Sequence, residues 1–179
     1  MKVIGGPPRR EGLLVGCKNG AVMKVFADNA FPIPLMKQST AVRCVDLSAN
    51  REKLAVVDDY SNLFVYDIKT QQQLYKESGA ISVAWNTEFE EMLSFTGNGN
   101  LYIKTSNYEP SSQRLPGFVV GFKGCKIFSL FQTQMNTIDV PQSSTFYRFL
   151  EDKNYEMAYR IACLGVTEQE WRMLGTETL

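Results

Sequence analysis

A group of four short apolar segments that recurs along the chain limits the fold more than any other feature. In residues 41–77 the segments are Val42–Leu47, residues 54–57, residues 63–68 and a last run around Leu74 and Tyr75. Each is rich in Val, Leu, Phe and Tyr and is bounded by Asn, Asp, Ser or Lys, which is typical of short strands joined by tight turns. The residues predict four antiparallel strands connected by hairpins.

The same group occurs again after 39 residues, an offset that places Val42 on Ile81 and Leu54 on Leu93. A strand-containing repeat of about 40 residues is the pattern of β-propeller blades. A β-sandwich is the alternative, since its strands also recur every ~8–12 residues, but it gives no reason for groups of four. Further matching strands lie in residues 13–15, 22–26, 118–122, 127–131 and 135–140. The sequence therefore predicts a mainly β fold for residues 1–141, a partial propeller of about three four-stranded blades.

The charge and hydropathy of the chain exclude several classes of protein. Lys+Arg and Asp+Glu both total 19 among 179 residues, so no net charge attracts nucleic acid or an anionic membrane. Apolar runs are far shorter than the ~20 residues that span a bilayer, and the first residues lack the apolar core of a signal peptide. We expect a cytoplasmic protein with no nucleic-acid partner and no direct membrane insertion.

Groups that bind metals or cofactors are scarce. The cysteines, Cys17, Cys44, Cys125 and Cys163, are widely spaced, and the chain contains no histidine. Zinc and redox sites need such residues at short spacing. We expect structural thiols, with Cys44 and Cys163 as small buried apolar residues, and neither a metal site nor a cofactor.

Residues suited to catalysis form no recognisable motif either. Asp46, Asp58, Asp59 and Asp67 lie at predicted strand ends and turns, where a solvated carboxylate is the usual case. The glycine-rich residues 97–100 satisfy neither phosphate-loop pattern and predict a hairpin. The sequence predicts no catalytic residue. The alternative, an enzyme built on a propeller, would need a base or paired carboxylates at the central channel.

The connections between strands follow from local patterns. Residues 5–10, with two glycines and two prolines, predict a loop, and residues 110–116 predict a polar link. Asn19 and Gly20 predict a hairpin turn. The prolines of residues 31–35 predict that this segment lies at the edge of a sheet.

Three aromatic residues carry expectations of their own. Trp85 follows an apolar strand and is expected to pack between blades. Tyr60 and Tyr108 lie in predicted turns and are expected to be exposed, where such residues can anchor a partner.

Residues 142–179 change to a helical pattern. Residues 145–151 and 155–164 carry apolar side chains at helical spacing, and Gly165 suits the left-handed residue that ends a helix. Thr167 and Glu170 then form the capping box that begins another helix. The residues predict a short tetratricopeptide-like helical segment; a helical cap on the propeller is the alternative.

The blades resemble degenerate WD repeats. Tyr66-Asp67 closes a third strand where such a repeat carries Trp-Asp. The family's hydrogen-bond network also uses a histidine before the first strand, which this chain lacks. Asp58 or Asp59 occupies the turn where the family keeps an aspartate, and we expect it to act as a turn former.

A more specific resemblance covers nearly the whole chain. The residues that carry it are 2–16 (KVIGGPPRREGLLVG), 40–44 (TAVRC), 82–87 (SVAWNT), 117–121 (GFVVG) and 162–167 (ACLGVT). They are similar to the WD-repeat subunits of intraflagellar transport complex A, which are coatomer-like scaffolds. The resemblance implies a non-enzymatic scaffold at the cilium and ciliary base, acting in retrograde transport, cilium assembly and ciliary entry of membrane cargo. It implies other complex A subunits as partners, with ciliary cargo adaptors also possible; a vesicle-coat scaffold is the alternative.

The number of predicted blades bears on how the chain behaves alone. A propeller closes with at least ~4 blades, and an open end leaves an apolar face uncovered. We therefore expect a fragment or truncated product that is marginally stable alone, self-associates or needs further blades.

Overall fold

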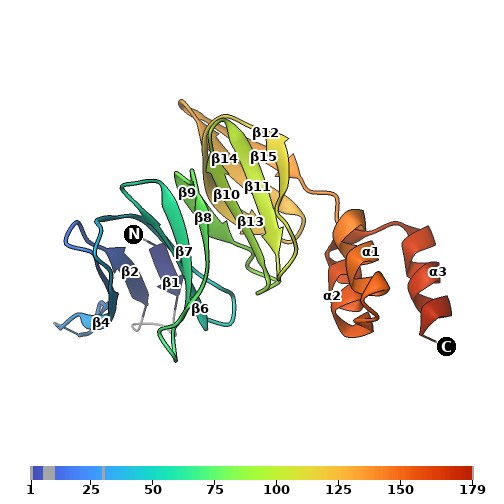
Figure 1. Ribbon diagram of the computed structural model, residues 1–179, viewed down its shortest axis with the longest axis horizontal. Helices are drawn as coiled ribbons and strands as arrows, with labels where there is room; N and C mark the ends of the chain where they lie inside the picture. Colours follow the sequence, from blue (N-terminus) through green and yellow to red (C-terminus); the bar gives the residue numbers. More distant parts are fainter. Residues whose placement is uncertain (1, 6–10, 30, 179) are drawn as a thin grey trace.

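The computed structural model describes residues 2–5, 11–29 and 31–178. In this part of the chain, four antiparallel sheets are followed by three helices at one end of the molecule (Figure 1). The strands of each sheet lie side by side in the order of the sequence, as in propeller blades. The predicted fold class is confirmed.

Three sheets have four strands and the last has three among the described residues. Blade 1 contains β1 (Lys2–Gly5), β2 (Gly12–Gly16), β3 (Ala21–Phe26) and β4 (Ile33–Lys37). Blade 2 contains β5 (Val42–Leu47), β6 (Lys53–Asp58), β7 (Asn62–Asp67) and β8 (Gln73–Ser78). Blade 3 contains β9 (Ser82–Trp85), β10 (Met92–Gly97), β11 (Asn100–Thr105) and β12 (Ser111–Arg114). Blade 4 contains β13 (Phe118–Lys123), β14 (Lys126–Phe131) and β15 (Gln134–Asp139).

Two outer connections differ from the sequence prediction. Residues 110–116 do not form a polar link, because Ser111–Arg114 pairs with β11 as the outermost strand of blade 3. All four residues of this strand are exposed, so no apolar alternation marks it. The predicted loop over residues 5–10 is wrong at Gly5, which belongs to β1; the rest of that loop lies outside the described residues.

The other predicted turns are confirmed. Asn98 and Gly99 have φ values of 53° and 75° and join β10 to β11 in a hairpin. Gly20, at φ 83°, ends the turn between β2 and β3. The proline-containing strand β4 lies at the outer edge of blade 1, as expected.

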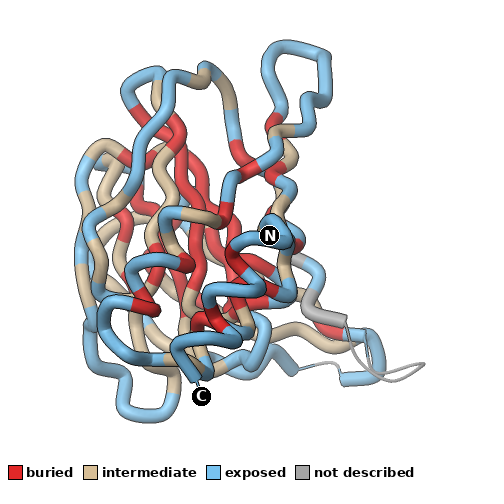
Figure 2. Tube along the Cα trace, turned by 90° about the vertical axis from the view of Figure 1, so that its right-hand side faces the viewer, coloured by how far each residue is buried: buried red, intermediate tan, exposed pale blue. Residues whose placement is uncertain are grey.

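Apolar side chains between neighbouring blades form the cores of the β region, and the buried residues gather along the strands (Figure 2). Trp85 is 3% exposed and packs with residues of both blade 2 and blade 3, which confirms its predicted position. The core between blades 1 and 2 contains Leu14, Val22, Val42, Val45, Leu47, Leu54 and Val56. Blades 2 and 3 thus each use one sheet face against the preceding blade and the other against the following one.

Asp58 lies at the turn between β6 and β7, and its side chain also contacts the segment before β5. Its carboxylate accepts the backbone N–H of Asn62 at 2.8 Å and the Thr40 hydroxyl at 3.1 Å. Thr40 precedes β5, which is where the WD pattern places its histidine. A hydroxyl therefore supplies one hydrogen bond of the missing imidazole, and Asp58 is 1% exposed instead of solvated.

The helices α1 (Ser143–Glu151), α2 (Tyr155–Gly165) and α3 (Glu168–Glu177) follow blade 4 directly. Gly165 has φ 134° and ends α2, as the sequence predicts. The capping box of Thr167 and Glu170 begins α3, also as predicted. No helix of the described residues is both long enough and apolar enough to cross a membrane.

The cysteines are free thiols, and one differs from its predicted environment. Cys17, Cys44 and Cys125 are half-buried, whereas Cys163 is exposed on α2. The buried position predicted for Cys163 is wrong because the buried residues of α2 are its neighbours Ala158, Ile161 and Ala162.

Candidate interaction site at the blade–helix junction

The loop between β9 and β10 forms the blade side of a junction with the helices. Asn86 is fully buried, and its side-chain amide donates to the carbonyl of Gly124 at 2.7 Å. Its carbonyl oxygen accepts the N–H groups of Gly124 at 3.2 Å and Glu88 at 2.9 Å. One side chain therefore fixes the loop of blade 3 to the β13–β14 turn of blade 4.

Aromatic side chains fill the space between this loop and the helices. Phe89, from the loop, is 1% exposed and meets Phe149 of α1 edge to face, with 6.4 Å between ring centroids. Tyr108, from the β11–β12 connection, meets the same ring at 5.2 Å. These aromatic residues belong to a core that also contains buried side chains of blades 3 and 4 and of all three helices. The helices are therefore packed against blades 3 and 4.

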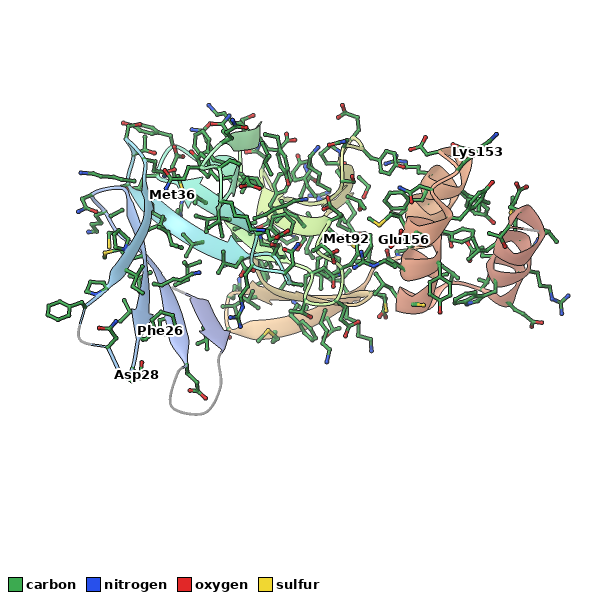
Figure 3. The ribbon with its side chains drawn as sticks, turned by 90° about the horizontal axis from the view of Figure 1, so that it is seen from below. Phe26, Asp28, Met36, Met92, Lys153 and Glu156 are labelled. Carbon is green, nitrogen blue, oxygen red and sulfur yellow. The ribbon has the colours of Figure 1, made fainter. Side chains whose placement is uncertain are left out.

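An ion pair closes the junction on the side of α2. The Arg160 guanidinium donates two hydrogen bonds to the Glu90 carboxylate, at 2.8 and 2.5 Å. It also lies over the Phe89 ring, 5.0 Å from the centroid, in a cation–π contact. The hydrogen bonds from Arg160 lower the pKa of Glu90. Met92 and Glu156 in Figure 3 mark the two sides of this boundary.

A second polar contact joins blade 3 to the end of α1. The Tyr108 hydroxyl donates to the Asp152 carboxylate at 2.5 Å, and the Arg148 guanidinium lies over the Tyr108 ring. Burial and the hydrogen bond to Asp152 raise the pKa of Tyr108 to about 12. Tyr108 lies in the turn as expected, but it is half-buried and not exposed, because it packs against Phe149 of α1. Tyr60 is exposed as expected, at 77%.

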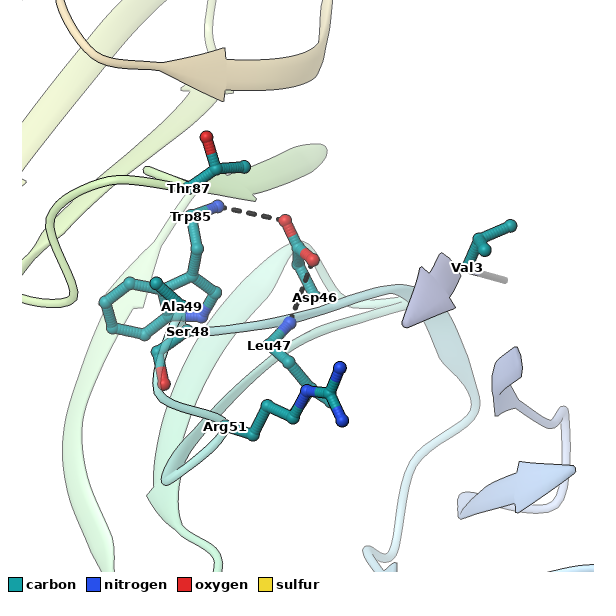
Figure 4. A pocket seen from close by; sticks show the side chains of 8 residues that line it. All are labelled: Val3, Asp46, Leu47, Ser48, Ala49, Arg51, Trp85 and Thr87. Carbon is teal, nitrogen blue, oxygen red and sulfur yellow. Dashed lines mark hydrogen bonds between the residues drawn. The ribbon is translucent and has the colours of Figure 1, made fainter. Parts of the chain in front are cut away.

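A cavity of about 220 Å³ lies where the inner parts of blades 1, 2 and 3 approach one another (Figure 4). The Asp46 carboxylate beside it accepts the backbone N–H groups of Leu47 at 2.8 Å and Trp85 at 2.9 Å. Asp46 is 2% exposed, so the solvated position expected for it is wrong. Through the hydrogen bond to Trp85, the Asp46 side chain joins blade 2 to blade 3.

Asp59 is exposed and Asp67 half-buried, and neither lies at the cavity. Among the described residues, no group of three or more His, Cys, Asp or Glu side chains is placed to hold a metal ion. Sequence patterns give no sign of the roles of Asn86, Glu90 and Arg160. Glu90 and Arg160 are 70 residues apart, so no local pattern could have paired them.

The comparisons with known proteins now identify the family. The family described as IFT122 second beta-propeller matches residues 1–135. The chain belongs to this family. It is 54% identical to the intraflagellar transport protein 122 homolog of Danio rerio, and 55% identical to those of Xenopus tropicalis and Homo sapiens, over all 179 residues. The chain spans only 14–15% of the length of these relatives.

A solved structure gives the same fold without close sequence similarity. A chain of the crystal structure of the mitotic checkpoint complex superposes with a TM-score of 0.57 at 18% identity. The match covers 73% of this chain and 46% of that one. This likeness shows the fold of the blades alone.

Proposed function

We propose that this chain is a non-enzymatic scaffold segment of intraflagellar transport complex A. The observation that carries the proposal is its membership of the IFT122 second beta-propeller family, with 54–55% identity over its whole length to intraflagellar transport proteins. The partners are other complex A subunits and ciliary cargo adaptors. The setting is the cytoplasm, the cilium and the ciliary base, where the complex supports retrograde transport, cilium assembly and entry of membrane cargo.

The junction supports this role because it makes a rigid platform from two kinds of repeat. Residues 1–141 are proposed as the propeller unit and residues 142–179 as the start of a helical solenoid. Since Phe89, Tyr108 and Phe149 pack in one core, the helices keep a fixed direction relative to the blades. A scaffold subunit needs such a direction, because its binding surfaces must meet several partners at once.

The test is recovery of complex A subunits on a tagged form of the chain expressed in ciliated cells. We expect those subunits to co-purify with the wild-type chain. Arg160→Glu places two carboxylates at the junction and is expected to reduce recovery. Arg172→Glu is the matched control, because Arg172 is 79% exposed and pairs only within α3. A thermal unfolding curve shows that each variant is folded.

Two outcomes would contradict the proposal. Absence of every complex A subunit from the purified material would remove the scaffold role in this complex. Recovery of vesicle-coat subunits in their place would favour the coatomer-like alternative.

A further inference from the structure

A groove of about 400 Å³ lies between the outer parts of blades 1 and 2. Its blade 2 wall carries Phe64 and Tyr66 of β7, whose rings are stacked with 6.2 Å between centroids. Its blade 1 wall is formed by residues 36–40, at the end of β4 and before β5; Met36 of this wall is labelled in Figure 3. Both walls therefore belong to two blades that follow one another within the chain.

The corresponding gap between blades 2 and 3 is closed by the chain's own side chains. There Lys104 of β11 forms an ion pair with Glu77 of β8 at 3.6 Å and lies over the Tyr75 ring. Strand pairing places Met36 of β4 at the position equivalent to Glu77, and Tyr66 of β7 at the position equivalent to Lys104. The gap between blades 1 and 2 thus has an apolar and an aromatic side chain where the next gap has an ion pair.

Two lysines place positive charge at the rim of this groove. Lys37 lines it directly, and the Lys76 ammonium lies over the Phe64 ring, 5.2 Å from its centroid. Both lysines are exposed, and among the described residues neither forms an ion pair. The Asp58 carboxylate, which accepts the Thr40 hydroxyl, is buried and does not line the groove. The rim therefore attracts negatively charged groups.

Side-chain amides add hydrogen-bonding groups to the walls. Gln38 lines the groove, and its side-chain oxygen is buried with no hydrogen-bond partner in the part of the chain that the structure describes. This oxygen suits a ligand that brings an N–H group. On the other wall, Gln71 donates to the Leu35 carbonyl of β4 at 3.3 Å, so this carbonyl is already bonded and is not left for an added strand.

We propose that this groove binds an extended acidic segment of a partner protein. Apolar side chains of the segment pack on Phe64 and Tyr66, and one of its N–H groups donates to Gln38. Its carboxylates meet Lys37 and Lys76, which supply the charge complementarity that selects the segment. The inference rests on the groove and not on the proposed role in transport.

The test is fluorescence anisotropy of the 179-residue chain with a fluorescein-labelled short peptide that alternates glutamate with leucine. We expect saturable binding, at least about tenfold tighter than binding of the same peptide with lysine in place of glutamate, because repulsion then replaces attraction at both lysines. Hydrogen exchange measured with the acidic peptide should slow in residues 33–40 and 71–76. Protection confined to other parts of the chain would contradict the assignment.

A pair of double variants separates the groove from attraction to charge in general. Lys37→Glu with Lys76→Glu is expected to abolish binding of the acidic peptide. Lys123→Glu with Lys126→Glu is the matched control, because it makes the same change of charge at exposed positions of blade 4, and it should bind as wild type does. A thermal unfolding curve shows that both variants are folded.

Four results would overturn the proposal. They are no binding of the acidic peptide by wild type, equal binding of the lysine peptide, equal weakening in the two double variants, and a labelled single-stranded oligonucleotide that binds as tightly as the acidic peptide. The last would assign the positive rim to nucleic acid instead.

Discussion

At the scale of single residues, buried polar side chains connect blade 2 to blade 3 and blade 3 to blade 4. Asp46 and Trp85 are 39 residues apart, which is the repeat offset found in the sequence, and they hydrogen-bond across blades 2 and 3. Ser82 joins blades 3 and 4 in the same way by accepting the N–H of Val119 at 2.8 Å. The repeat therefore contained a signal for these contacts, because equivalent positions in neighbouring blades lie side by side around the inner strands.

Trp85 tests how much one residue between blades contributes. Trp85→Ala should lower the free energy of unfolding by about 3–5 kcal/mol, because it removes a large aromatic side chain from a packed core. Trp171→Ala is the control, since Trp171 is 38% exposed and should cost much less. Urea unfolding followed by circular dichroism gives both values. Equal losses of unfolding free energy in the two variants would show that Trp85 contributes no more to stability than the partly exposed Trp171.

The Glu90–Arg160 pair predicts a dependence on pH. The folded pKa of Glu90 is below its ordinary value of 4.5, so the ionised carboxylate favours the folded state. This contribution is complete above about pH 4.5 and is lost as the pH falls through the folded pKa. Glu90→Gln should therefore destabilise the protein by about 1 kcal/mol or less at pH 7, because the pair is partly exposed.

The measurement is the difference in unfolding free energy between wild type and Glu90→Gln at pH 7 and pH 3. The difference should shrink at the lower pH. A difference that stays constant between the two pH values would mean that Glu90 does not act through its charge.

At the scale of secondary-structure elements, the strands with a buried face were predictable, whereas the outermost strand of blade 3 was not. The apolar residues of β5, β6 and β7 alternate or cluster as a buried strand requires. By contrast, β12 pairs along one edge only and is composed of Ser, Gln and Arg. Backbone hydrogen bonds to β11 hold this strand in place, and such bonds do not require particular residue types.

The close approach of β10 to the segment before β9 predicts opposite effects of alanine at two glycines. A Cβ on Gly97 would lie 1.5 Å from the carbonyl oxygen of Gly79, so Gly97→Ala must displace backbone and should cost at least about 1–3 kcal/mol. Gly175 lies within α3 with no atom near its Cβ position. Gly175→Ala should stabilise the protein by about 0.4–1 kcal/mol. Thermal unfolding of the two variants measures both effects. A Gly97→Ala variant as stable as wild type would contradict the close approach of Gly97 to Gly79.

At the scale of the whole molecule, the shared core joins the helices to blades 3 and 4. The sequence predicted both the blades and the helices, but it did not predict the junction. The residues that form it are far apart in the chain, and Tyr108 carries no local sign of the helix that covers it. Long-range contacts of this kind depend on the arrangement of complete elements.

This shared core predicts that blades and helices unfold together. The chain has two tryptophans, so Trp171→Phe leaves fluorescence that reports only on Trp85, between blades 2 and 3. The unfolding curve from this fluorescence should coincide with the curve from helical circular dichroism at 222 nm. Separate midpoints for the two signals would show that residues 142–179 unfold independently of the blades.

The Thr40 hydroxyl lies before β5, where a WD repeat carries a histidine, and the two groups respond differently to pH. Histidine is the side chain that ordinarily changes its charge between about pH 5 and 8, and this chain has none. A threonine hydroxyl, unlike an imidazole, does not gain a proton in that interval, so the donor to Asp58 stays the same. Within blade 2, the turn between β6 and β7 is therefore bound to the segment before β5 by a donor that does not respond to the acidity of its surroundings.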